Sequence, residues 1–180
     1  MKCLKVVIVC GILAAGCGIL FIYSGYYNVS AAVQDPAMLR WVYETTMDNS
    51  VSRHAKAIEV PALDDSTMIR TGFAHFHEMC EICHGAPGVK TSELAKGLNP
   101  DAPDLSESAE EMTAAELFWV TKNGVKMTGM PSWGKTHTDE KIWDMVAFMK
   151  TLPGMTAEDY RRLVRSTEMV ENTELEESEI

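Results

Sequence analysis

The sequence predicts an all-α protein in which a single N-terminal transmembrane helix precedes a small helical domain. Residues 6–23 carry no charged side chain, and as a helix they are long enough to cross a bilayer. Several later segments place apolar residues at helical spacing between capping residues. The segment 80–84, Cys-Glu-Ile-Cys-His, is a third indication, because residues three and four apart share one face of a helix.

The composition fits one domain of ordinary size with extensions, and its charge argues against nucleic-acid binding. The chain has 180 residues, 46% of them hydrophobic, and a formal net charge of -10. Contacts to phosphates need clusters of Lys and Arg. Much of the negative charge lies in a C-terminal tail that we expect to be disordered and solvated. Its glutamates are Glu168, Glu171, Glu174, Glu176, Glu177 and Glu179.

The first element is a helix over residues 6–23, which would be about 27 Å long. Lys2 and Lys5 precede it and predict an N-terminus in the cytoplasm, with everything after Tyr27 on the other side of the membrane. Three tyrosines form an expected aromatic belt at the far interface: Tyr23, Tyr26 and Tyr27.

Two alternatives to a retained anchor exist for this segment. Val29-Ser30-Ala31 could serve as the cleavage site of a signal peptide, and Cys17 follows a sequence that resembles a lipoprotein acylation site. We favour the anchor because the apolar run is long and continues beyond Cys17 through Ile22. Cys3, Cys10 and Cys17 recur every seven residues, and we expect them to be free thiols.

The stretch 28–62 is too long to be a simple tether. Asp35-Pro36 predicts a helix start, with Asp35 as the N-cap and Pro36 at the first helical position. Apolar residues then follow with a loose helical period: Met38, Leu39, Trp41, Val42, Met47, Val51 and Ile58. This helix either lies on the membrane or a partner subunit, or packs on the domain that follows.

The next helix is expected after caps at Asp64-Asp65-Ser66, and it carries Gly72, Phe76 and Cys80 at intervals of four. A glycine inside a helix costs up to ~1 kcal/mol, so another helix should approach closely at Gly72. The expected partner starts after Thr138 and runs to the stop at Pro153-Gly154. Its apolar side comprises Ile142, Trp143, Val146, Phe148 and Met149.

Two further helices are predicted from their caps. Thr113 and Glu116 form a capping box that opens a short helix, which Gly124 closes. After Gly154, Thr156 caps a polar helix from Ala157 to about Met169.

Cys-x-x-Cys-His is the attachment sequence of a c-type haem. Cys80 and Cys83 can present their sulfurs to one porphyrin edge, and His84 can offer a ring nitrogen to the iron. A thioredoxin-like motif would not need the histidine, and a zinc site would need further Cys or His ligands. We therefore favour a covalently bound haem c (heme c) with its iron.

The sixth position of the iron decides the function, because it is either filled or open. Met130 lies in a Gly-Met-Pro sequence, whose glycine and proline favour a rigid, extended loop. Met127 is a fallback and His137 a weaker alternative. His75 and His77 share the helix of His84 and can hardly reach the opposite face of the haem.

The chain resembles the class I, single-haem c-type cytochromes, including bacterial membrane-anchored forms, over about residues 66–152. Besides the motif at 80–84, the resemblance includes Gly72 and Phe76, Pro103-Asp104-Leu105, Asn123-Gly124, Gly129-Met130-Pro131, and Ile142-Trp143 with Phe148. It implies a cytochrome c fold, with crossed first and last helices around a covalent haem. It also implies that the Pro103 carbonyl orients His84, that Leu105 packs on the ring, and that Met130 is the sixth ligand.

Four parts are expected: an anchor (1–27), an amphipathic connecting segment (28–62), a haem domain (63–154), and a polar helix with an acidic tail (155–180). The expected function is one-electron transfer in a respiratory or other redox chain, rather than catalysis. The partners would be redox proteins or membrane oxidoreductase subunits, on the periplasmic side of the bacterial inner membrane. The main alternative is a haem enzyme or gas sensor with an open sixth site, and an adaptor with incidental haem ranks last.

Overall fold

The computed structural model describes residues 2–178, which form helices and irregular loops without a β-strand. The chain divides into two compact units, Met1–Gln34 and Asp35–Ile180. The all-α class predicted from the sequence is confirmed.

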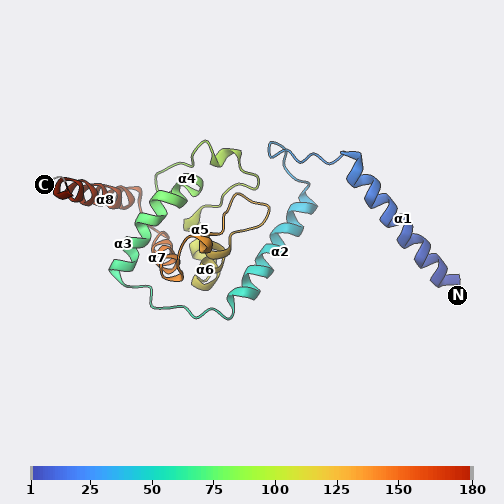
Figure 1. Ribbon diagram of the computed structural model, residues 1–180, viewed down its shortest axis with the longest axis horizontal. Helices are drawn as coiled ribbons and strands as arrows, with labels where there is room; N and C mark the ends of the chain where they lie inside the picture. Colours follow the sequence, from blue (N-terminus) through green and yellow to red (C-terminus); the bar gives the residue numbers. More distant parts are fainter. Residues whose placement is uncertain (1, 179–180) are drawn as a thin grey trace. The chain divides into compact units, whose positions relative to one another are not determined.

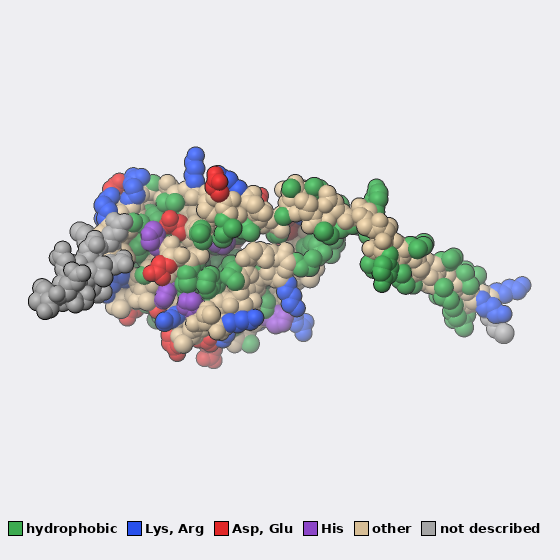
Figure 2. Space-filling view, turned by 45° about the horizontal axis from the view of Figure 1, so that its top comes forward, with side chains coloured by type: hydrophobic (Ala, Val, Ile, Leu, Met, Phe, Trp, Pro, Cys, Tyr) green, Lys and Arg blue, Asp and Glu red, His purple; other side chains and the backbone are tan. Residues whose placement is uncertain are grey.

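The first unit contains α1, Lys2–Ser24. Its mean hydropathy is 2.6, none of its residues is buried, and it is long and apolar enough to cross a membrane. Figure 2 shows hydrophobic side chains along this helix, with lysines at its N-terminal end. Cys3, Cys10 and Cys17 are free and exposed on it. The helix fits a single-pass membrane anchor.

The centre of the second unit is the crossing of α3, Ser66–His75, with α7, Asp139–Met149 (Figure 1). Asp65 caps α3, because its carboxylate accepts from the N–H groups of Thr67 and Met68. At Gly72 a Cβ would overlap the Asp144 carbonyl of α7 and would lie 3.0 Å from the Phe148 Cβ. The two backbones can approach this closely only because residue 72 has no side chain, which confirms the predicted crossing.

Large side chains of both helices, and of Phe76 directly after α3, fill the core around this crossing. Phe73, Phe76, Ile142, Met145, Val146 and Phe148 are almost completely buried. The Phe73 and Phe148 rings meet edge to face with centroids 5.2 Å apart, a favourable aromatic geometry.

The helix that carries the predicted attachment motif is not a regular α-helix. After α3 the backbone opens into one turn of π-helix, η1, Phe76–Cys80, and closes again in α4, Glu81–His84. The Glu81 N–H donates to the Phe76 carbonyl, five residues earlier. The extra residue in this turn changes the angle between Phe76 and Cys80 that a regular spacing of four predicts.

The remaining short helices complete the haem-domain region predicted from the sequence. They are η2, Ala95–Gly97; α5, Leu105–Glu111; α6, Ala114–Asn123; and η3, Trp133–Lys135. The capping box is confirmed, since Thr113 Oγ1 accepts from the Glu116 N–H at 3.2 Å and Glu116 Oε2 accepts from the Thr113 N–H at 2.9 Å. α6 packs on α7, where the Phe118 and Trp143 rings stack with centroids 4.1 Å apart.

Helix α2, Ala37–Ala55, begins one residue later than predicted, because Pro36 is extended and occupies the N-cap position. Its C-terminal half packs on α6 through the buried side chains of Val51 and Ala55. Ser52 Oγ donates to Glu116 Oε1 at 2.6 Å, and the His54 ring stacks on Trp119 with centroids 5.3 Å apart. For this half of the helix, packing on the domain is the alternative that the contacts support.

Helix α8 runs from Ala157 to Ser178, well beyond the predicted end near Met169. No glycine or proline interrupts this Glu-rich segment, and glutamate is a good helix former. Thr156 caps the helix as predicted, because its Oγ1 accepts from the Asp159 N–H at 3.1 Å. Glu179 lies outside the described residues.

Tyr160 joins α8 to the motif helix and is completely buried. Its hydroxyl donates to Glu81 Oε2, the same oxygen that accepts from His77 Nδ1 at 2.7 Å. Burial is the main cause that raises the pKa of Tyr160, followed by its contact with the Glu81 carboxylate. The hydroxyl therefore stays protonated and remains a donor at all physiological pH values.

Replacing Tyr160 with phenylalanine should lower the free energy of unfolding by about 1–2 kcal/mol, because a hydrogen bond to the half-buried Glu81 carboxylate is lost. Chemical denaturation of the holoprotein in detergent measures the loss. Tyr43→Phe removes a hydroxyl from a tyrosine that is 44% exposed and should change stability by less than about 0.5 kcal/mol. Equal losses in the two variants would contradict a stabilising role for the Tyr160–Glu81 bond.

Candidate functional site

The site is built around the end of α4, where the backbone places Cys80, Cys83 and His84 within two turns. Cys80 is buried and Cys83 is half-buried. Burial, with a smaller effect of Cys83, raises the pKa of the Cys80 thiol to about 12. The reactive thiol of a redox-active Cys-x-x-Cys site has a lowered pKa, which is the opposite direction.

The orientation of the His84 ring is set by one hydrogen bond. Nδ1 donates to the Pro103 carbonyl oxygen at 2.8 Å, which leaves Nε2 as the free ring nitrogen. Burial lowers the pKa of His84, and the hydrogen bond to Pro103 and the nearby Asp104 charge oppose this effect. The ring is therefore neutral at neutral pH, the form in which histidine binds metals.

The loop 85–104 holds Pro103 in place and ends in a helix cap. Asp104 Oδ1 accepts from the Ser106 N–H at 2.7 Å and so caps α5, whose first residue is Leu105. Leu105 is half-buried and packs on the hydrophobic core. The role of Asp104, which caps α5 and also lies beside His84, was not predicted, although an Asp directly before a helix is a usual cap signal.

Two pockets of about 380 and 370 Å³ adjoin this loop. Cys83 lines the first and His84 the second, and both are lined by Thr91, Lys96 and Ala102. There is thus open space beside the side chains of Cys83 and His84. In the part of the chain that the structure describes, no three or more His, Cys, Asp or Glu side chains are grouped in a way that could hold a metal ion.

Met130 lies in a loop that folds back against the C-terminal end of α6. Its N–H donates to Thr128 Oγ1 at 3.1 Å, and its carbonyl accepts from the Val125 N–H at 3.3 Å. Gly124, with φ at +66°, ends α6 in the left-handed region. A Cβ there would lie 2.7 Å from the Met130 carbonyl oxygen, so only glycine allows this close approach.

The same loop contacts the loop 85–104 through Leu98. A Cβ at Gly129 would lie 2.6 Å from Leu98 Cδ2, so the two loops meet at the residue before Met130. Leu98 was not predicted as part of the site, and its position depends on a contact between loops far apart in sequence.

The two candidate methionines differ in exposure. Met130 is half-buried, whereas Met127 is 76% exposed and has a left-handed backbone with φ at +62°. A left-handed conformation is uncommon for a methionine. Met130, the preferred candidate, and Met127, the fallback, thus differ in both burial and backbone conformation.

The other candidate histidines contact protein side chains. His77 donates to Glu81 and stacks on Phe73 with ring centroids 5.8 Å apart. His75 meets His137 with centroids 5.6 Å apart, and His137 also meets Trp133 at 5.5 Å. Partial burial is the main cause that lowers the pKa of His75.

The family model described as "Cytochrome C oxidase, cbb3-type, subunit III" matches residues 67–149. The matched segment begins in α3, ends with α7, and includes the motif at 80–84, Pro103 and Met130. No curated protein and no solved structure matches the chain.

Proposed function

We propose that this chain, whose residues 67–149 form a c-type cytochrome domain, carries single electrons by means of one covalently attached haem c with a histidine and a methionine as axial ligands. When bound, the haem supplies an iron that takes up and releases one electron. Electron transfer through haem is the activity that the domain itself supports. The number of haems, the covalent bonds and the ligand pair are our proposals.

The observation that carries this proposal is the hydrogen bond from His84 Nδ1 to the Pro103 carbonyl. It holds the proton on Nδ1 and leaves the basic nitrogen, Nε2, free, so that His84 would bind the haem iron through Nε2. Cys80 and Cys83, three residues apart, supply the two thiols for thioether bonds. The three residues of the motif therefore fit haem c in residue type, and His84 also fits it in tautomer.

Met130 is the proposed sixth ligand, because its backbone is held at Gly124 and its side chain is half-buried. A thioether is a soft, uncharged ligand that suits iron in both oxidation states and raises the reduction potential. Leu105, packed at the start of α5, is the proposed apolar neighbour of the ring.

The proposed location follows from the anchor helix and from the lysines that precede it. α1 would cross the bacterial inner membrane once, with Lys2 and Lys5 in the cytoplasm and the haem domain on the periplasmic side. The name of the matching family, a subunit of a cbb3-type oxidase, supports a place in a respiratory chain. The partners would be redox proteins or membrane oxidoreductase subunits, and the chain would act as a relay rather than as an enzyme.

Optical spectra of the purified holoprotein test the ligand pair. With both axial positions filled, we expect low-spin iron, a methionine-to-iron charge-transfer band in the oxidised state, and no rapid binding of carbon monoxide by the reduced state. High-spin iron that binds carbon monoxide at once would contradict the carrier and favour the haem enzyme or gas sensor. Mass spectrometry of the denatured protein checks the covalent attachment and the single haem independently.

A further inference from the structure

The N-terminal half of α2 exposes large apolar side chains that no part of the described domain covers. Met38 is 77% exposed and Trp41 is 64% exposed, and Val42 and Tyr43 are also exposed. Met38, Trp41 and Val42 are three and four residues apart and so share one face of the helix. One turn further on, this face continues with polar residues, Thr45 and Asn49, so the apolar patch is confined to the first two turns.

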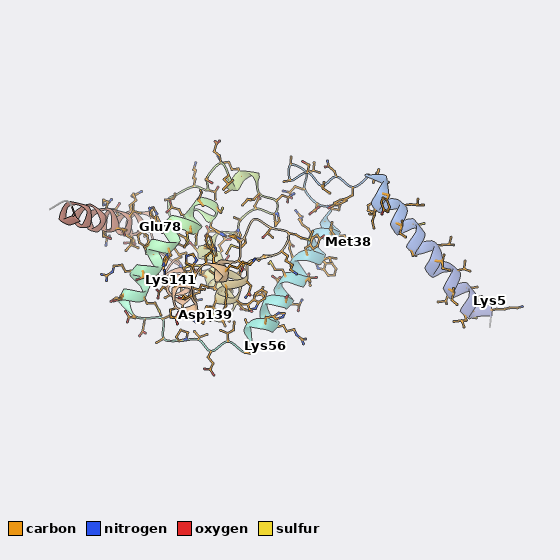
Figure 3. The ribbon with its side chains drawn as sticks, viewed as in Figure 1. Lys5, Met38, Lys56, Glu78, Asp139 and Lys141 are labelled. Carbon is orange, nitrogen blue, oxygen red and sulfur yellow. The ribbon has the colours of Figure 1, made fainter. Side chains whose placement is uncertain are left out.

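The patch is rigidly connected to the haem domain. The second half of the same helix is fastened to α6 by Val51, Ala55 and the Ser52–Glu116 hydrogen bond. α6 in turn leads through Gly124 into the loop of Met130. Figure 3 shows Met38 at the N-terminal end of α2 and Lys56 just beyond its other end. Whatever contacts the patch therefore sets the orientation of the whole domain.

A membrane surface is within reach of the patch. Only twelve residues, 25–36, separate the end of α1 from the start of α2, and they span at most about 40 Å. This connection contains Tyr26 and Tyr27, and tyrosine and tryptophan are the side chains enriched at membrane interfaces. The segment Ala37–Tyr43 contains no Asp or Glu, which anionic headgroups would repel.

We propose that Met38, Trp41 and Val42 lie in the lipid headgroup region and hold the haem domain against the bilayer in one orientation. The proposal goes beyond electron transfer as such and requires only that α1 is a membrane anchor. A second copy or a protein partner could also cover an apolar patch, but the bilayer is the surface to which the chain itself tethers this helix. The donor and acceptor would then be proteins that present their redox centres close to the membrane.

Nitroxide labels on single cysteines test the proposal in the holoprotein, reconstituted into phosphatidylcholine–phosphatidylglycerol vesicles. The labelled variant is Val42→Cys, with Cys3, Cys10 and Cys17 replaced by serine. A chain that retains only Cys10 of the anchor cysteines reports the bilayer interior, and Glu110→Cys on the exposed side of α5 reports water. Electron paramagnetic resonance measures collisions of each label with oxygen, which concentrates in lipid, and with a neutral nickel chelate, which stays in water.

We expect the ratio of oxygen to nickel collisions at position 42 to lie between those of the two controls and several-fold above that of Glu110→Cys. Met38→Cys should give the same result, which guards against a local effect of one label. A ratio at position 42 equal to that of Glu110→Cys would overturn the proposal. Protection from both reagents would also overturn it, because a protein would then cover the patch. A water-like ratio at Cys10 as well would show that the anchor itself is not inserted, and this outcome leaves the haem ligands unaffected.

Discussion

Replacing Met130 with alanine should open the sixth position of the haem iron. The charge-transfer band of the oxidised protein should disappear, and the reduced protein should bind carbon monoxide. The reduction potential should fall by on the order of 0.1 V or more, a part of the roughly 0.8 V that axial ligands span. Optical redox titration measures the potential, and visible spectra measure the ligation. The expected change is large because the loop offers no replacement ligand. No other described side chain of the Met130 loop combines a thioether with partial burial.

Met127→Ala is the matched control, since it removes the same side chain from the same loop. Because Met127 is largely exposed, the Met127→Ala variant should keep the optical spectrum and the reduction potential of the unmodified protein. A loss of the charge-transfer band in Met127→Ala but not in Met130→Ala would assign the ligand to Met127. Unchanged spectra in both variants would contradict methionine ligation from this loop.

Replacing Gly72 with alanine should destabilise the domain by at least about 3 kcal/mol, the upper end of typical overpacking effects. The new Cβ would overlap the Asp144 carbonyl, and a backbone atom of a packed helix cannot turn aside as a flexible side chain can. α3 and α7 would have to separate, which would loosen the contacts of Phe73 and Phe76 with Phe148. Denaturant unfolding of the holoprotein, followed by far-UV circular dichroism, measures the effect.

Gly97→Ala is the corresponding control within the same domain. A Cβ there meets no atom within 4 Å, so its effect on stability should stay below about 0.5 kcal/mol. If Gly72→Ala proves as stable as Gly97→Ala, the close crossing of the two helices at residue 72 is wrong.

The two halves of α2 illustrate why a single sequence pattern left its placement open. The apolar residues of this helix follow only a loose helical period, so the sequence did not show which face is buried. The structure uses Val51 and Ala55 as the buried side and leaves Met38 and Trp41 exposed. Which side is buried depends on α6: Ser52 donates a hydrogen bond to Glu116, and the His54 ring stacks on Trp119.

The features that the sequence alone determined are those whose physical causes lie within a few residues. The apolar run of α1, the caps at Asp65 and Thr113, and the spacing of Cys80, Cys83 and His84 belong to this class. A missing side chain at Gly72 also indicated a crossing helix, because a glycine within a helix is costly without a packing reason.

The tertiary structure alone decided the features that depend on contacts between distant segments. Tyr160 meets Glu81 across 79 positions, and Ser52 meets Glu116 across 64, and neither pair leaves a periodic signal. The difference between Met130 and Met127 likewise required the loop to close on Gly124 and Leu98. Local backbone preferences act over one or two turns, whereas burial and hydrogen bonding between elements depend on how the whole chain packs.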